Sequence, residues 1–332
     1  MRHRPLPSPE GFGLAKELLS HVCGSLPQLI ICRALKVSGL AGGIELADRL
    51  LASEGGDPVP ALHAYLGISG HHREKPFEEA IELRCNELTS APLDGGILLK
   101  NLQLIGQEAG LDETETLLVF IRIAARLDGM LHAAIRPLLL DCIDPVMKLN
   151  LDVLLGVEPC TSERLLQPAA PLAQSGLLVT RRNIGSPLEA RLEIPQGLMA
   201  GLLQPLASPA EVISRLVTRA PRGGLGIADF THIASDIRML QLLLGDALDS
   251  RRVGVNILLH GSPGVGKTEL ADVLARELDA SLFTIPAYAD GQVHEPLERL
   301  REYRLAQGLV RSAGRSLILL DEVEDLFPYA LW

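Results

Sequence analysis

Aromatic side chains are scarce in this sequence. Phe, Trp and Tyr together make up 3% of the 332 residues and there is one Trp, whereas hydrophobic residues reach 47%. Cores with so few aromatic rings are typical of helices that pack aliphatic side chains, so we expect a largely helical protein. The length leaves room for two or three domains.

Paired cysteines and metal-ligand patterns are missing as well. The five cysteines stand at positions 23, 32, 85, 142 and 160, with no CxxC pair and no spacing typical of metal ligands. We therefore expect buried, unpaired thiols in a reducing compartment, which makes the cytoplasm the expected location.

Long apolar runs and an excess of positive charge are also lacking. No stretch reaches the roughly 20 apolar residues that span a bilayer, and no signal-peptide run follows the basic N-terminus, so neither a membrane nor export is expected. The net charge of -10 argues against a general affinity for polyanions, because nucleic-acid binders neutralise phosphates with a basic face.

The apolar and turn residues divide the chain into four parts. Residues 1–94 carry short amphipathic helices separated by Gly, Pro and Ser. Residues 95–204 are predicted to hold helices followed by two β-like runs, LLVT and ARLEI, around a turn, which favours a winged-helix-like module. Residues 205–228 are rich in Pro and Gly and indicate a linker before the last part, residues 229–332.

A winged-helix-like module could contact a protein or DNA. The helix expected around residues 161–175, which would enter a groove, sets Arg164 beside Glu163 and offers little else to phosphates. We therefore favour an unknown protein partner. DNA contact is the alternative and would use the three arginines around the turn, Arg181, Arg182 and Arg191.

A glycine-rich loop gives the strongest signal for chemistry. The sequence GSPGVGKT, residues 261–268, follows a strand-like run at 253–260 and precedes a helical pattern, which is the context of a P-loop. Such loops bind polyphosphate with inward-turned backbone N–H groups and a helix N-terminus. The predicted nucleotide-binding residues are Gly261, Ser262, Pro263, Gly264, Val265, Gly266, Lys267, Thr268 and Glu269.

An acidic pair supplies the second half of the predicted site. Residues 316–320 have the pattern of a buried strand and end at Asp321 and Glu322, and ligands lie beyond the carboxyl ends of such strands. Together with the loop, the pair predicts ATP and Mg²⁺ as ligands. Thr268 and Asp321 would hold Mg²⁺. Lys267 would reach the β- and γ-phosphates, and Glu322 would polarise the attacking water.

GSPGVGKT and LILLDE, with RLREYRLAQ between them, resemble the nucleotide-binding core of AAA+ ATPases over about residues 229–327. The resemblance implies a homo-oligomeric ring and a parallel sheet in which a further strand separates the two strands that carry the motifs. It also implies sensor residues and an arginine finger, which this sequence does not contain. The expected fold is a mainly α N-terminal region with a winged-helix-like module, followed by a partial α/β P-loop domain.

The chain is therefore expected to be truncated after the acidic pair and impaired in hydrolysis. The strands around Ile257 and Leu319 would lack their shared partner, so either they close the gap or the domain is only partly folded. The expected function is ATP binding and hydrolysis coupled to remodelling of an unknown partner. The alternatives are a P-loop kinase, which shares the loop but does not need the acidic pair, and a non-enzymatic DNA- or protein-binding regulator.

Overall fold

The computed structural model describes most of the chain, which divides in sequence into two compact units between Leu206 and Ala207. The described residues are 16–51, 58–139, 144–177, 201–208, 223–252, 254–285, 296–310 and 314–326, the pairs 179–180, 192–193, 218–219, 288–289 and 292–293, and residues 199 and 211. Each unit is described by itself.

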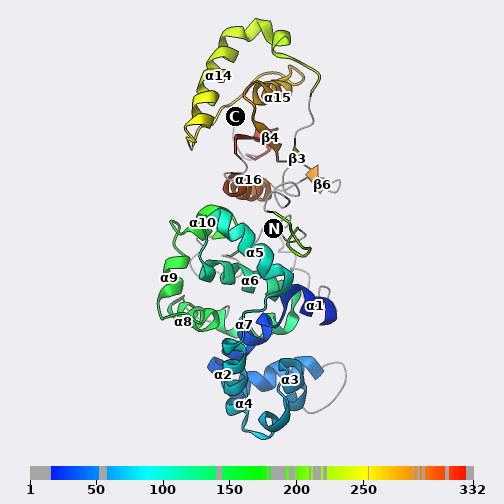
Figure 1. Ribbon diagram of the computed structural model, residues 1–332, viewed down its shortest axis with the longest axis vertical. Coiled ribbons are helices and arrows are strands. Elements are labelled where there is room, and N and C mark those ends of the chain that lie inside the picture. Colours follow the sequence, from blue (N-terminus) through cyan, green and yellow to red (C-terminus); the bar gives the residue numbers. More distant parts are fainter. Residues whose placement is uncertain are drawn as a thin grey trace, which may run out of the picture. The chain divides into compact units, whose positions relative to one another are not determined.

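The first unit is helical, as the composition predicts (Figure 1). Its elements are α1 (Lys16–Cys23), α2 (Leu26–Leu51), α3 (Pro58–Leu66), η2 (Gly70–Glu74), α4 (Phe77–Ser90), α5 (Gly96–Ala109), α6 (Glu113–Leu127), α7 (Gly129–Leu139), α8 (Asp144–Leu155), α9 (Thr161–Leu165), α10 (Pro171–Ser175), β1 (Val179–Thr180) and β2 (Leu192–Glu193).

Helix α2 is the central element of this unit. It packs against α3, α4, α7 and α8, and its residues Ile30 and Ile31 are fully buried. A helix that is apolar around most of its circumference is stable only when other elements cover it on several sides. Because α2 packs against α7, and α1 against α5, helices from both sides of the predicted boundary at residue 94 share one body.

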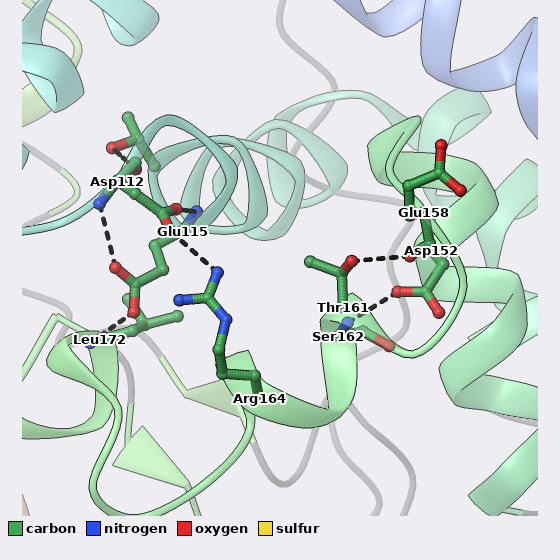
Figure 2. A network of polar contacts seen from close by, with 9 residues as sticks. Asp112, Glu115, Asp152, Glu158, Thr161, Ser162, Arg164 and Leu172 are labelled. Carbon is green, nitrogen blue, oxygen red and sulfur yellow. Dashed lines mark hydrogen bonds and ion pairs between the residues drawn. The ribbon is translucent and has the colours of Figure 1, made fainter.

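Helix α6 begins with a capping box that extends into a larger network (Figure 2). The backbone N–H of Glu115 donates to Asp112 at 2.8 Å, and that of Asp112 donates to the Glu115 carboxylate at 3.0 Å. Glu115 is 2% exposed and also accepts from the Leu172 N–H at 3.1 Å. One buried carboxylate thus serves two helix beginnings, α6 and α10, whose N–H groups lack partners within their own helices.

A second buried carboxylate holds α9 onto α8 (Figure 2). Asp152 is 3% exposed and accepts from the N–H groups of Cys160 and Ser162, both at 2.7 Å. Cys160 itself is exposed, whereas Cys23, Cys32 and Cys85 are buried. The expectation of buried thiols is therefore wrong for Cys160. This residue has a left-handed backbone conformation (φ 71°) and directly precedes α9. Cys142 lies outside the described residues.

The hairpin predicted from LLVT and ARLEI forms, with β1 and β2 antiparallel and Val179 opposite Glu193. Arg181, Arg182 and Arg191 lie outside the described residues, and a winged-helix arrangement stays a prediction. The last residues of the unit are bound by the side chain of Asn101 on α5, which is 2% exposed. Its amide donates to the carbonyls of Leu202 and Gln204, both at 2.8 Å, and accepts from the Leu206 N–H at 3.2 Å.

The second unit combines helices with a small sheet. Its elements are β3 (Thr218–Arg219), η3 (Ile227–Ile233), α14 (Ala234–Asp249), α15 (Lys267–Glu277), β4 (Ser281–Thr284), β5 (Tyr288–Ala289), β6 (Gln292–Val293), α16 (Pro296–Val310), β7 (Ser316–Leu319) and η5 (Val323–Leu326).

The sheet has the order β3-β4-β7. Strands β4 and β7 are parallel, with Leu282 opposite Leu317, and α16 lies between them in the sequence. Strand β3 pairs antiparallel with β4. It lies within residues 205–228, so part of the segment predicted to be a linker joins the sheet.

The core of this unit lies between η3, α14 and α15. Its buried members are Phe230, Ile237, Leu270, Val273 and Leu274, with Ile227, Ile233, Leu240, Leu244 and Leu259 packed against them. The inner face of α14 is therefore an apolar stripe of residues three or four positions apart.

The structure describes residues 254–260 of the strand predicted at residues 253–260, and these residues do not form a strand. Residues 254–260 have no strand pairing, and Leu258 is 71% exposed. Strand β7, predicted to be buried on both faces, is only half-buried. An apolar run favours burial, but a strand also needs an adjacent strand to hydrogen-bond its N–H and C=O groups. None of the described strands pairs with residues 254–260.

Among the described residues, no single helix has the length and apolar character needed to cross a bilayer. The segments Glu17–Cys23 and Leu26–Gly39 meet such a criterion only when taken together, and they are bent by 88° relative to each other.

Candidate nucleotide-binding site

The glycine-rich loop leads directly into helix α15. Gly264 has φ 80° and Gly266, the residue before the first helical turn, has φ 86°. Side chains rarely adopt this left-handed region, so glycine is needed at both positions. The unpaired N–H groups of the first turn and the positive end of the helix dipole then face the loop, which is an arrangement suited to anions.

The side chain of Phe230 packs against the end of the loop at Gly266. A Cβ atom added to Gly266 would lie 3.5 Å from the Phe230 ring, which is 4% exposed in the core against α15. Leu259, two residues before the loop, packs against the same core. The loop is thus anchored at both ends, although residues 254–260 pair with no strand among those described.

Lys267 places its ammonium group inside the loop. Its Nζ donates to the carbonyl oxygens of Gly261 at 2.8 Å and of Ser262 at 3.1 Å. An ammonium group has three donors, so at least one is left to reach an added acceptor such as a phosphate oxygen. Ser262, Pro263, Gly264 and Val265 are exposed, and their backbone forms the rim of the loop.

Thr268 and Asp321, 53 residues apart in the sequence, meet in the structure. The Thr268 hydroxyl donates to Asp321 Oδ2 at 2.8 Å, and Asp321 Oδ1 accepts from the Glu322 N–H at 3.1 Å. Because the hydroxyl donates a hydrogen bond to the carboxylate, the lone pairs of Oγ1 remain available to a cation. An oxygen pair of this kind, completed by phosphate and water oxygens, suits Mg²⁺. The residues predicted to hold Mg²⁺ therefore fit that ion.

Glu322 and Glu269, the other two predicted acidic residues, differ in their surroundings. Glu322 is exposed and has φ 50°, a left-handed conformation that is uncommon for a residue with a side chain. Glu269 is half-buried, and its Oε2 atom has no hydrogen-bond partner among the described residues. A Cβ added to Gly223 would lie 1.9 Å from that atom, so the Glu269 carboxylate faces the segment before η3.

Sequence reasoning missed the contacts that fix this preceding segment to α15. The Gly223 N–H donates to Asp272 Oδ2 at 2.9 Å, and the same oxygen accepts from Arg276 Nε at 3.0 Å. Arg276 also donates to the Leu225 carbonyl at 2.5 Å. The i, i+4 spacing of Asp272 and Arg276 could have indicated their ion pair. No local pattern indicates the contact with residues 223–225.

Sequence reasoning also missed Arg299 on α16, whose guanidinium lies against the acidic pair. It donates to the carbonyl oxygens of Asp321 at 2.5 Å and of Glu322 at 3.3 Å. An arginine within a helical pattern carries no signal of such a contact. In the described part of the chain, no cluster of three or more His, Cys, Asp or Glu side chains could hold a metal ion by itself.

Together, the loop, the helix behind it and the acidic pair beyond a parallel strand define a P-loop type of nucleotide-binding module. Residues 257–330 match the family "ATPase family associated with various cellular activities (AAA)". The resemblance to AAA+ ATPases is thereby confirmed for this part of the chain.

Curated relatives match part of the chain. The chain is 36% identical over 118 residues to ATPase family gene 2 protein homolog B of Mus musculus, covering 32% of this chain and 15% of that protein. It is 39% identical over 73 residues to the replication factor C large subunit of Natronomonas pharaonis, covering 22% and 15%.

A third relative is the Holliday junction branch migration complex subunit RuvB of a Synechococcus species. The identity is 32% over 129 residues, covering 38% of this chain and 33% of that protein. The chain thus spans between 15% and 33% of the length of these relatives. No solved structure matches it significantly. The family and the relatives support an ATPase-type function with a nucleotide and a divalent metal as ligands.

Proposed function

We propose that the second unit binds ATP with Mg²⁺ and hydrolyses it slowly, and that the first unit carries a site for a protein partner that the full machine remodels. The observation that carries the nucleotide part is the 2.8 Å bond between Thr268 and Asp321. It joins the loop and the acidic pair into one site, although they are far apart in the sequence. Assembly into a homo-oligomeric ring and a cytoplasmic location belong to the same proposal.

The roles of the residues follow from their atoms. The backbone N–H groups of residues 261–268 other than Pro263, together with the Lys267 ammonium, would bind the phosphates. Mg²⁺, when bound, neutralises developing charge on the phosphate oxygens, and Thr268 and Asp321 would hold it. The exposed Glu322 carboxylate can accept a proton from water at the same edge.

Slow turnover is proposed because the loop is only partly supported. Residues 254–260 pair with no described strand and Leu258 is 71% exposed, so the segment before the loop is held by Leu259 rather than by a sheet. Positioning to within fractions of an ångström normally needs a rigid scaffold around the reacting groups. Phosphate binding is less demanding, because it uses backbone N–H groups of the loop and α15.

The test is ATP binding and phosphate release by the whole chain. Lys267→Ala should weaken ATP binding by about tenfold or more, since hydrogen bonds to charged groups contribute about 1.5–3 kcal/mol. Lys100→Ala removes an exposed lysine of the first unit and is the matched control. Glu322→Gln should retain binding and abolish phosphate release. Equal ATP affinity in Lys267→Ala and Lys100→Ala would refute the proposed site.

A further inference from the structure

Arg299 is a fully buried cation next to the acidic pair. It is 1% exposed, and by volume it is the largest fully buried residue in the described part of the chain. It lies in the first turn of α16, and α16 packs against both β7 and η5, the elements on either side of Asp321 and Glu322. A charge is costly to bury unless its hydrogen bonds are satisfied. The Arg299 Nε atom has no hydrogen-bond partner among the described residues, so the two Nη groups make the contacts of this guanidinium.

The partners of these Nη groups are two consecutive backbone carbonyls rather than a side chain. Arg299 Nη2 donates to the Asp321 oxygen at 2.5 Å, and Nη1 donates to the Glu322 oxygen at 3.3 Å. The first carbonyl belongs to the peptide group before Glu322, and the second belongs to the peptide group after it. One rigid, planar guanidinium therefore holds the two peptide planes whose relative rotation defines φ and ψ of Glu322.

The conformation held in this way is an unfavourable one. Glu322 has φ 50°, and the left-handed region costs a residue with a Cβ roughly 1–2 kcal/mol. Two further contacts depend on it: the Glu322 N–H donates to Asp321 Oδ1 at 3.1 Å, and the Glu322 carbonyl accepts from the Asp325 N–H at 3.1 Å. Such a conformation persists when its surroundings over-determine it, and it is found most often at functional sites.

We propose that Arg299 is the positioning residue of the acidic pair. By fixing both peptide groups of Glu322, it keeps the Asp321 carboxylate on Thr268 while the Glu322 side chain remains in solvent beside the loop. Arg299 touches neither nucleotide nor metal in this role and acts through the backbone. The predicted effect of Arg299 on Mg²⁺-dependent ATP binding rests on the proposed nucleotide site. Its predicted effect on the backbone conformation of Glu322 rests on the geometry alone.

Two substitutions and one control test this role in the whole chain. Arg299→Met keeps an unbranched apolar stem and removes the donors, whereas Arg299→Lys keeps a positive charge with donors that can reach a carbonyl. Arg238→Met removes an exposed arginine from α14 of the same unit. ATP binding is measured with Mg²⁺ and with EDTA, and thermal unfolding is recorded for each variant.

The expected result is a selective loss of the Mg²⁺ effect. Arg299→Met should bind ATP in EDTA within about threefold of the parent protein, and the gain in affinity on adding Mg²⁺ should fall by about tenfold. Arg299→Lys should recover part of that gain. Equal weakening in EDTA and in Mg²⁺ would show a merely structural role and overturn the inference, as would an unchanged Mg²⁺ effect in Arg299→Met.

Hydrogen exchange separates this inference from the proposed function. Amides in the peptide that contains residues 321–326 should exchange faster in Arg299→Met than in Arg238→Met, while those of residues 261–270 remain unchanged. If the parent protein fails to bind ATP but this difference is found, the proposed function fails and the positioning role stands. If exchange in residues 321–326 is the same in both variants, the positioning role fails whatever the outcome of the ATP titration.

Discussion

Replacing Thr268 by Val isolates the contact between the loop and the acidic pair. Valine keeps the branched shape of threonine and lacks only the hydroxyl that donates to Asp321 at 2.8 Å. A hydrogen bond to a charged group contributes about 1.5–3 kcal/mol, and about 1.4 kcal/mol corresponds to a tenfold change in affinity. Because Thr268 is exposed, the lower end of that range applies. We expect about a tenfold loss of ATP affinity in the presence of Mg²⁺.

The assay is a titration with a fluorescent ATP analogue, performed with Mg²⁺ and again with EDTA. In EDTA the variant should equal the parent protein, because the loop N–H groups and Lys267 remain. Thr268→Ser retains the hydroxyl and should behave like the parent protein under both conditions. Thermal unfolding should change little, since the removed hydroxyl lies at the surface. If Thr268→Val keeps the full Mg²⁺ effect, the assignment of Thr268 and Asp321 to the metal is refuted.

Three further predictions concern the first unit. Asp152→Ala should lower the free energy of unfolding, measured in urea, by about 2–4 kcal/mol, because two N–H groups lose their buried acceptor. The control Glu163→Ala removes an exposed ion pair with Lys148 and should change the free energy of unfolding by less than about 0.5 kcal/mol. Equal effects of the two substitutions would contradict the role of Asp152. Burial raises the pKa of Cys23 and Cys32 from the ordinary value of 9.0 to about 12, so a thiol reagent at pH 8 should modify the exposed Cys160 first, as peptide mass mapping would show. Since the unfolded thiols lose their protons near pH 9 and the folded ones near pH 12, stability should fall as the pH rises through that interval, and a Cys23→Ala variant with an unchanged pH dependence would contradict this.

The parts of the site that are local in sequence could be predicted. The loop, the helix after it and the acidic pair each occupy one continuous stretch, and the chemistry of phosphate binding dictates their residue types. The capping box of α6 and the inner face of α14 were accessible for the same reason, since both depend on spacings of three or four residues.

The parts that depend on distant neighbours could not be predicted. The apolar run at residues 253–260 has the composition of a strand, but whether it becomes one is decided by a partner elsewhere in the chain. The packing of helices from both sides of residue 94 into one body could not be predicted, because the covering of α2 by α7 has no signature in either helix. Arg299 escaped notice because its acceptors are backbone carbonyls, which every residue carries, so the sequence contains no complementary residue type to search for.

The amide of Asn101 also decides where this protein can be divided. A fragment that ended at residue 200 would lack the carbonyls of Leu202 and Gln204 and leave a 2% exposed amide group without partners in the interior. A fragment that ended after Leu206 would keep all three bonds. Residues 202–206 therefore satisfy the hydrogen bonds of a buried side chain, and an expression fragment of the helical unit should include them.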